Sequence, residues 1–204
     1  LKLMQPFFYC HRINSSNELN KFPDNYGIEI DLCDKDDKII LVHDPFQNGE
    51  DFEEFEDFLK RYNKRSIILN VKSERIEYKI IELLKKYNVH EYFFLDCSFP
   101  MIYQLNKINE KNIAIRFSEF ESIESVMLVK DMVKWVWVDC FNDFPLTPES
   151  YKKIKKANLK ICLVSPELQS HNISRIQEFK DIIEKNEFEI DAICTKHYNI
   201  DLWR

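Results

Sequence analysis

The chain has 204 residues, of which 29 are basic and 35 are acidic, so its formal net charge is −6 at pH 7. Lysines and glutamates are spread along helix-like segments without forming a basic face, and we therefore expect neither nucleic acid nor an anionic membrane as a partner. No apolar run approaches the roughly 20 residues that span a bilayer, and no export signal precedes the first strand-like run. We expect a cytoplasmic protein with no transmembrane segment, and the sequence leaves its oligomeric state open.

Six cysteines and two glycines narrow the possible chemistry. The cysteines each lie in or at the end of an apolar run, and none forms a C-x-x-C pair: Cys10, Cys33, Cys97, Cys140, Cys162 and Cys194. This pattern favours reduced thiols that pack as small hydrophobic groups over a disulfide framework or a zinc site. Gly27 and Gly49 are the only glycines, which excludes a Walker loop, a G-x-G-x-x-G turn and a G-x-S-x-G nucleophile elbow.

Strand-like and helix-like segments alternate along the chain. The predicted strands cover Phe7 to Cys10, Ile28 to Cys33 with an extension from Ile39 to Val42, Ile67 to Val71, Tyr92 to Cys97, Ile113 to Phe117, Trp135 to Cys140, Leu159 to Val164 and Asp191 to Cys194. The predicted helices cover Ser15 to Lys21, Asp51 to Tyr62, Ser73 to Tyr87, Met101 to Ile108, Ser122 to Met132, Pro148 to Ala157 and Ser174 to Asn186. Thr147 followed by Pro148 is a typical helix start.

Near-continuous apolar strands that alternate with amphipathic helices indicate a parallel sheet covered on its outer faces. The extension belongs to its parent strand, so the count is eight, and we predict that residues 1–204 form a single-domain, compact (β/α)8 TIM barrel with short loops. An open doubly wound sheet is the alternative, but the glycine-rich first turn that typifies it is missing. In a barrel, the carboxyl ends of all strands converge on one mouth.

Acidic, basic and imidazole side chains follow the first predicted strands. Glu29 and Asp31 are two residues apart and so share one face of an extended strand. A buried acidic pair normally needs a cation, a basic side chain or solvent beside it. His11 follows the first strand and His43 follows the extension, and both should reach the same mouth. Carboxylates suit Mg²⁺ or Ca²⁺, and histidines beside them can serve as acid and base.

Two residues of the third strand complete this group. Asn70 can offer an amide oxygen to the same ion, and Lys72, on the same strand face, can neutralise an anionic substrate. The collection indicates phosphate ester chemistry, in which cations hold the phosphoryl oxygens while one imidazole activates a nucleophile and another protonates the leaving alkoxide.

The sequence here resembles the glycerophosphodiester phosphodiesterase superfamily, which is also similar to the spider-venom-type phospholipase D toxins. The matching motifs, in chain order, are His11-Arg12 with Asn14, Glu29-x-Asp31, His43-Asp44 and Asn70-x-Lys72. The resemblance implies a metal-dependent barrel that cleaves a phosphodiester, with His11 and His43 as the acid–base pair. It also implies that Glu29 and Asp31 bind the metal, with Asn70 in the third ligand position.

The chain departs from the family's pattern at two positions. Ile13 stands where the family usually has glycine, and Asn70 stands where it has an acidic ligand. Hard cations are held largely by ligand charge, so we expect Asn70 to weaken metal binding. Asp96 from the fourth strand is a possible replacement carboxylate.

Four residues are predicted to contact the substrate: Arg12, Lys72, Arg116 and Glu167. Arg116 lies in a predicted strand, where a charge needs a partner and a substrate phosphate is one candidate. Glu167 follows a strand end and is placed to bind a sugar or glycerol hydroxyl. Two readings stay open: Lys72 either contacts substrate or pairs with Glu29, and the two acids either hold a metal or pair with a basic neighbour.

The main hypothesis is a phosphodiesterase that acts on a small, water-soluble, glycerophosphodiester-like substrate, either by hydrolysis or by internal attack that releases a cyclic phosphate. A second is a catalytically impaired barrel that binds a phosphorylated ligand. A third is a metal-independent lyase or sugar-active barrel, in which Glu29 and Asp31 would act as acid and base.

Overall fold

The strands build one nearly closed barrel in the computed structural model, which describes residues 5–46 and 52–204. They are β1 (Phe7–Cys10), β2 (Gly27–Lys35), β3 (Lys38–Leu41), β4 (Ile67–Val71), β5 (Tyr92–Leu95), β6 (Ala114–Phe117), β7 (Trp135–Val138), β8 (Lys160–Val164) and β9 (Ala192–Thr195). Eight run parallel in the order β5-β4-β2-β1-β9-β8-β7-β6, and an isolated bridge between Phe94 and Ile113 joins the two ends. The predicted TIM barrel is confirmed.

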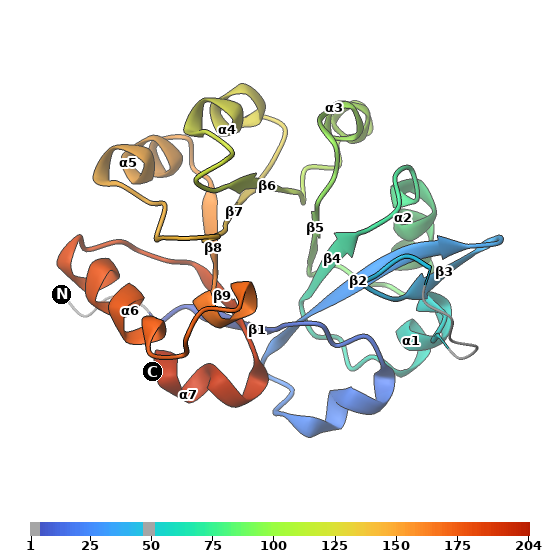
Figure 1. Ribbon diagram of the computed structural model, residues 1–204. Coiled ribbons are helices and arrows are strands. Elements are labelled where there is room, and N and C mark those ends of the chain that lie inside the picture. The colour runs from blue at the N-terminus through green and yellow to red at the C-terminus, as the bar shows by residue number, and fades with distance from the viewer. Residues whose placement is uncertain (1–4, 47–51) are drawn as a thin grey trace.

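Helices lie around the outside of the strands (Figure 1). The α-helices are α1 (Phe55–Arg61), α2 (Glu77–Lys86), α3 (Phe99–Lys107), α4 (Ile123–Val129), α5 (Pro148–Lys156), α6 (Arg175–Lys185) and α7 (Ile200–Trp203). Three short 3₁₀ helices join them: η1 (Ser16–Lys21), η2 (Pro166–Gln169) and η3 (His197–Asn199). No helix in the described part of the chain is both long and apolar enough to cross a bilayer.

Local capping explains where several helices begin. Thr147 and Ser150 form the reciprocal capping box of α5, as the Thr147-Pro148 pair predicts. Ser98 accepts a hydrogen bond from the backbone of Met101, so α3 begins at Phe99, two residues before the predicted start. The predicted first helix is the 3₁₀ helix η1, and the predicted helix from Asp51 begins outside the described residues.

The strands separate two apolar layers. Residues such as Ile28, Ile30 and Leu69 face outward and pack with the helices. Tyr9, Phe93, Trp137 and several other residues form a separate cluster that includes four buried residues of β8 and β9. Alternation along each strand assigns this second cluster to the barrel interior. The same inward–outward alternation holds on β2 and β4. Above the apolar interior cluster, the inward positions of these two strands carry the polar residues of the mouth.

The strand β2 continues past the barrel and pairs antiparallel with β3, with Cys33 opposite Ile40. In Figure 1 this hairpin projects beyond the other strands. The sequence predicts it as an extension of the second strand, and the structure confirms it. The hairpin places His43, just after β3, beside the mouth.

Candidate active site

The loop after β1 is bound to the acidic residues of β2. Parallel pairing of Cys10 with Ile28 sets the next residue, His11, beside Glu29, and its Nε2 lies 3.9 Å from Glu29 Oε2. The backbone N–H of Arg12 donates to Glu29 Oε2 at 2.7 Å. Asn14 donates its side-chain amide to Asp31 Oδ2 at 2.9 Å and accepts the Asp31 backbone N–H at 2.8 Å. The predicted His-Arg-x-Asn segment therefore packs directly against the acidic pair.

The strand β4 adds an amide and a cation to the same face. Asn70 pairs with Asp31 in the sheet register, and its Nδ2 donates to Glu29 Oε1 at 2.8 Å. Lys72 Nζ lies 3.7 Å from Asp31 Oδ1 and 3.2 Å from Asp96 Oδ2. Lys72 thus pairs with Asp31 and Asp96, whereas Glu29 was one of the two partners left open by the sequence.

The oxygen atoms between β2 and β4 fit a hard divalent cation. Glu29 and Asp31 are fully buried, and burial followed by the neighbouring charge of Glu29 raises the pKa of Asp31 to about 6. Oδ1 of Asp31 and Oδ1 of Asn70 are both buried without a hydrogen-bond partner. Within residues 5–46 and 52–204, no three His, Cys, Asp or Glu side chains are grouped as a metal site; beside the two carboxylates the amide oxygen of Asn70 is a neutral donor.

His43 is held on both sides of its ring. Its Nδ1 lies 2.6 Å from Asp44 Oδ1, and its Nε2 lies 2.6 Å from Nη2 of Arg12. A guanidinium can only donate hydrogen bonds, so Nε2 is the acceptor and the ring proton is on Nδ1, facing the Asp44 carboxylate. Arg12 therefore connects His43, through its side chain, with Glu29, through its backbone.

His11 is a neutral imidazole in this environment. Burial, together with the nearby positive charges of Lys196 and Arg12, lowers its pKa to about 3. Its Nδ1 is buried without a hydrogen-bond partner. His11 thus lies beside Glu29, and His43 is joined to Glu29 through Arg12.

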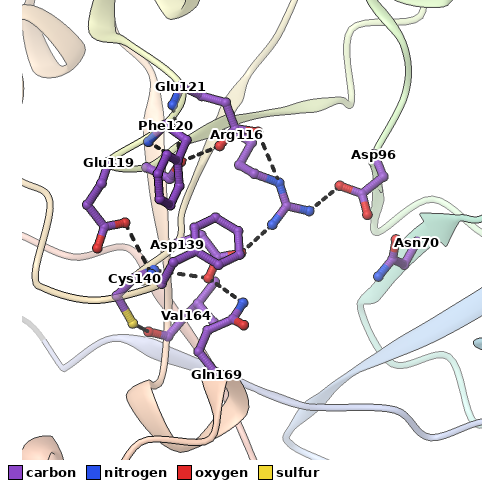
Figure 2. A network of polar contacts seen from close by, with 12 residues as sticks. Asn70, Asp96, Arg116, Glu119, Phe120, Glu121, Asp139, Cys140, Val164 and Gln169 are labelled. Carbon is purple, nitrogen blue, oxygen red and sulfur yellow. Dashed lines mark hydrogen bonds and ion pairs between the residues drawn. The ribbon is translucent and has the colours of Figure 1, made fainter.

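Arg116 lies at the centre of an ion-pair network across the mouth (Figure 2). Its guanidinium binds the carboxylates of Asp96 and Asp139 directly, and its Nε lies 3.7 Å from Glu121 Oε1. The other oxygen of Asp139 accepts a 2.8 Å hydrogen bond from Gln169. Because Asp96 also contacts Lys72, the ion pairs continue from Arg116 to the acidic pair of β2.

Glu167 follows β8, a strand that β1 and β9 separate from β2 in the sheet. Its Oε1 accepts hydrogen bonds from Thr195 at 2.6 Å, from Asn199 at 3.2 Å and from the Lys196 backbone at 3.3 Å. Ser165 binds its other oxygen. Oε1 thus holds the chain at the end of β9, and the other oxygen holds the chain just after β8.

The roles of Asp96 and Asp139 are hard to predict from sequence. Each follows a strand as an isolated acid, which is also what ordinary strand ends look like. Predicting the contact between Arg116 and Asp139 requires the register between β6 and β7. In that register Arg116 pairs with Trp137, and Asp139 lies two residues further along the same inward face. Asp96 pairs with two cations, Lys72 and Arg116.

The fold and the mouth define a class: a parallel barrel with two acids, two imidazoles and a lysine at the carboxyl ends of its first strands. Solved structures of this shape include a candidate glycerophosphodiester phosphodiesterase from Galdieria sulphuraria, with 15% identity, a TM-score of 0.72 and coverage of 99% of this chain and 98% of that one. A candidate glycerophosphoryl diester phosphodiesterase from Agrobacterium tumefaciens has 12% identity, a TM-score of 0.70 and 98% coverage of both chains. A glycerophosphodiester phosphodiesterase from Parabacteroides distasonis has 13% identity, a TM-score of 0.66 and 96% coverage of both.

The chain therefore has the fold of the glycerophosphodiester phosphodiesterases over its whole length, in agreement with the resemblance of its motifs. No protein-family model matches the sequence, and no significant match is found among curated protein sequences.

Proposed function

We propose that this protein is a phosphodiesterase that cleaves a small glycerophosphodiester-like substrate at the mouth of the barrel. The observation that carries the proposal is the contact of Arg12 with both Glu29 and His43, because it assembles motifs from three separate strands into one polar site. The shared fold with glycerophosphodiester phosphodiesterases supports the same reaction class.

In this proposal, His11 and His43 are the acid–base pair. His11 is neutral because its pKa is lowered, so it can accept a proton from the attacking oxygen. His43 keeps one ring proton on Nδ1 against Asp44, so it acts as general acid only after Nε2 takes up a second proton from solvent, which it then gives to the leaving alkoxide. For that step Arg12 has to release Nε2 of His43, and the substrate phosphate provides the alternative partner for its guanidinium.

Glu29, Asp31 and Asn70 would hold the divalent cation, Mg²⁺ or Ca²⁺, that the family's pattern implies. When bound, the cation would polarise a phosphoryl oxygen. Lys72, which lies 3.7 Å from Asp31, is placed to bind the phosphate as well. Arg116 and Glu167, both predicted as substrate contacts, have their polar atoms engaged by protein partners, and we assign them to holding the mouth together.

The attacking oxygen can come from water or from a hydroxyl of the substrate itself. Internal attack would release a cyclic phosphate with the same acid and base. Product analysis by phosphorus NMR distinguishes the two outcomes, since a cyclic diester and a monoester resonate at different positions.

The experiment that tests the proposal is an assay of the purified protein with bis(p-nitrophenyl) phosphate and with glycerophosphodiesters. Reactions are run with Mg²⁺ or Ca²⁺ and with chelator. We expect metal-stimulated turnover that falls by two or more orders of magnitude in His11→Ala and in His43→Ala. Unchanged activity in both variants would contradict the proposed site, and His90→Ala, at an exposed histidine remote in the sequence from the site motifs, is the matched control.

One contact favours a second candidate function, a barrel that binds a phosphorylated ligand without turnover. The amide of Asn70 occupies an oxygen of Glu29 and contributes no charge of its own, which weakens the cation site. This candidate predicts a thermal shift with glycerol phosphate and no hydrolysis at any metal concentration.

A further inference from the structure

The hairpin of β2 and β3 forms one wall of a cavity of about 480 Å³ that has His43 and Lys72 in its lining. These two residues also belong to the proposed active site. The cavity is therefore continuous with the place where the phosphodiester would be cleaved, and it lies on the hairpin side of His43.

The floor of this cavity is apolar because side chains alternate between the two faces of the hairpin, and those on the cavity face are apolar. The inward face of β2 carries Glu29 and Asp31, and then Cys33 two residues further on. Cys33 pairs with Ile40 across the hairpin, and Val42 follows on the same face of the chain. All three are buried and form a small cluster of their own, apart from the main core. An apolar ledge thus begins directly beyond the acidic pair.

The segment that precedes α1 adds a fourth apolar side chain, Phe52, to the ledge. A backbone bridge joins Ile40 to Glu54, and Leu41 donates to the Glu53 carbonyl at 2.9 Å. This pairing sets Phe52 against the ledge, where its ring is only partly buried. Cys33, Ile40, Val42 and Phe52 are all cavity-lining residues, and we call them the apolar ledge.

Charges around the cavity do not favour a cationic head group. Lys35 and Lys72 line it together with Asp34 and Asp44, so the rim carries both signs. Lys35 Nζ lies 5.7 Å from the centre of the Phe52 ring, which places an ammonium where a choline-like group would otherwise stack on that ring.

We propose that the apolar ledge selects substrates in which one alcohol of the phosphodiester is a short alkyl or aryl group, in preference to a charged or polyhydroxyl alcohol. The inference rests on the proposed function and specifies its substrate class. The phosphate would lie between Arg12 and Lys72, and the apolar group would extend past His43 onto the ledge, where each buried methylene replaces water contact with apolar contact.

The test uses methyl, butyl and hexyl esters of glycerol 3-phosphate as substrates. We expect kcat/KM to rise about fourfold for each methylene that reaches the ledge, the factor that corresponds to about 0.8 kcal/mol per CH₂. Ile40→Thr and Phe52→Ala should each lower the hexyl-to-methyl ratio about tenfold. Ile39→Thr is the matched control, because Ile39 is buried on the outward face of the same strand and should leave the ratio unchanged.

Hydrolysis of all three esters at similar rates, or a ratio that the ledge variants do not change, would overturn the inference while the proposed function stands. Absence of hydrolysis for every ester would defeat the proposed function instead. In that case the binding of hexylphosphonate and methylphosphonate, measured by calorimetry, decides the inference alone. Tighter binding of the hexyl compound that is lost in Ile40→Thr supports it, and equal affinities contradict it.

Discussion

Asn70 donates a 2.8 Å hydrogen bond to Oε1 of Glu29, the same carboxylate that accepts the backbone N–H of Arg12 through its other oxygen. This amide satisfies the buried carboxylate oxygen that Arg12 does not reach. If the proposed cation binds here, this contact stabilises the site without the cation and competes with it for Oε1 of Glu29.

Replacing Asn70 by aspartate should therefore have opposite effects on stability and on metal binding. Asn70→Asp removes the donor and adds a third buried negative charge, so we expect a lower Tm with chelator present. The added charge should tighten Ca²⁺ binding about tenfold, measured by calorimetry. Asn109→Asp makes the same charge change at an exposed position and is the control. A variant that binds Ca²⁺ no better than wild type would remove Asn70 from the cation site.

Asp44 fixes the tautomer of His43 through the 2.6 Å contact with Nδ1. In Asp44→Asn the ring can turn or exchange its proton, so we expect kcat to fall about 10- to 100-fold with little change in KM. The effect is smaller than for a fully buried triad aspartate because the Asp44 side chain is 59% exposed. Asp37→Asn, an equivalent charge change at the hairpin tip, should leave kcat unchanged. Equal losses in both variants would mean that only the general charge matters.

The first strands and their motifs were predictable because the alternation of side chains along a strand assigns each residue to the inward or the outward face. Glu29 and Asp31 interrupt an apolar strand at spacing two, and only a barrel mouth or an ion pair explains that pattern. His43 was predictable because an apolar run stops directly before it. The confirmed hairpin shows that a short polar turn between two apolar runs carries enough information.

The ion-pair network of Arg116 could not be predicted, because its partners come from three loops with no shared sequence pattern. The place of Trp137 is also not readable from the sequence: its ring belongs to the cluster of the barrel interior. Which inward layer a strand residue occupies depends on the stagger of the barrel, and a single sequence does not reveal that stagger.

Arg116 should contribute mainly to stability. Removing it in Arg116→Ala leaves Asp139, which is 1% exposed, without its cation, and we expect a loss of about 3 kcal/mol in the free energy of unfolding. The double variant Arg116→Ala with Asp139→Asn should recover part of that loss, because the unpaired buried charge is gone. Urea denaturation of the two single variants and the double variant measures this coupling. Strictly additive losses would show that the two side chains are energetically independent.

Gly27 leaves room for two aromatic rings at the base of the barrel. A Cβ at this position would clash with the ring of Tyr9 and lie 2.9 Å from the ring of Phe7. Tyr9 cannot easily move, because it is buried and its hydroxyl is 2.7 Å from Ser66 Oγ. We expect Gly27→Ala to destabilise the protein by about 1–3 kcal/mol, measured by thermal unfolding. A second change, Tyr9→Leu, should reduce the effect of Gly27→Ala if this clash is its cause.

Glu77, at the start of α2, should make stability depend on pH. The residue is 1% exposed, and burial raises its pKa although nearby hydrogen bonds from the backbone and Cys97 oppose the change. A carboxyl whose pKa is higher in the folded state binds more protons there, so its stabilising contribution is present at low pH and is lost as pH rises through the raised value. Glu77→Gln, which stays neutral, should therefore exceed wild type in Tm at pH 8, and the difference should narrow as pH falls towards 4. Glu82→Gln, at an exposed position of the same helix, is the control and should show no such trend. If the Tm difference between Glu77→Gln and wild type does not change with pH, the buried carboxyl is already paired in its charged form.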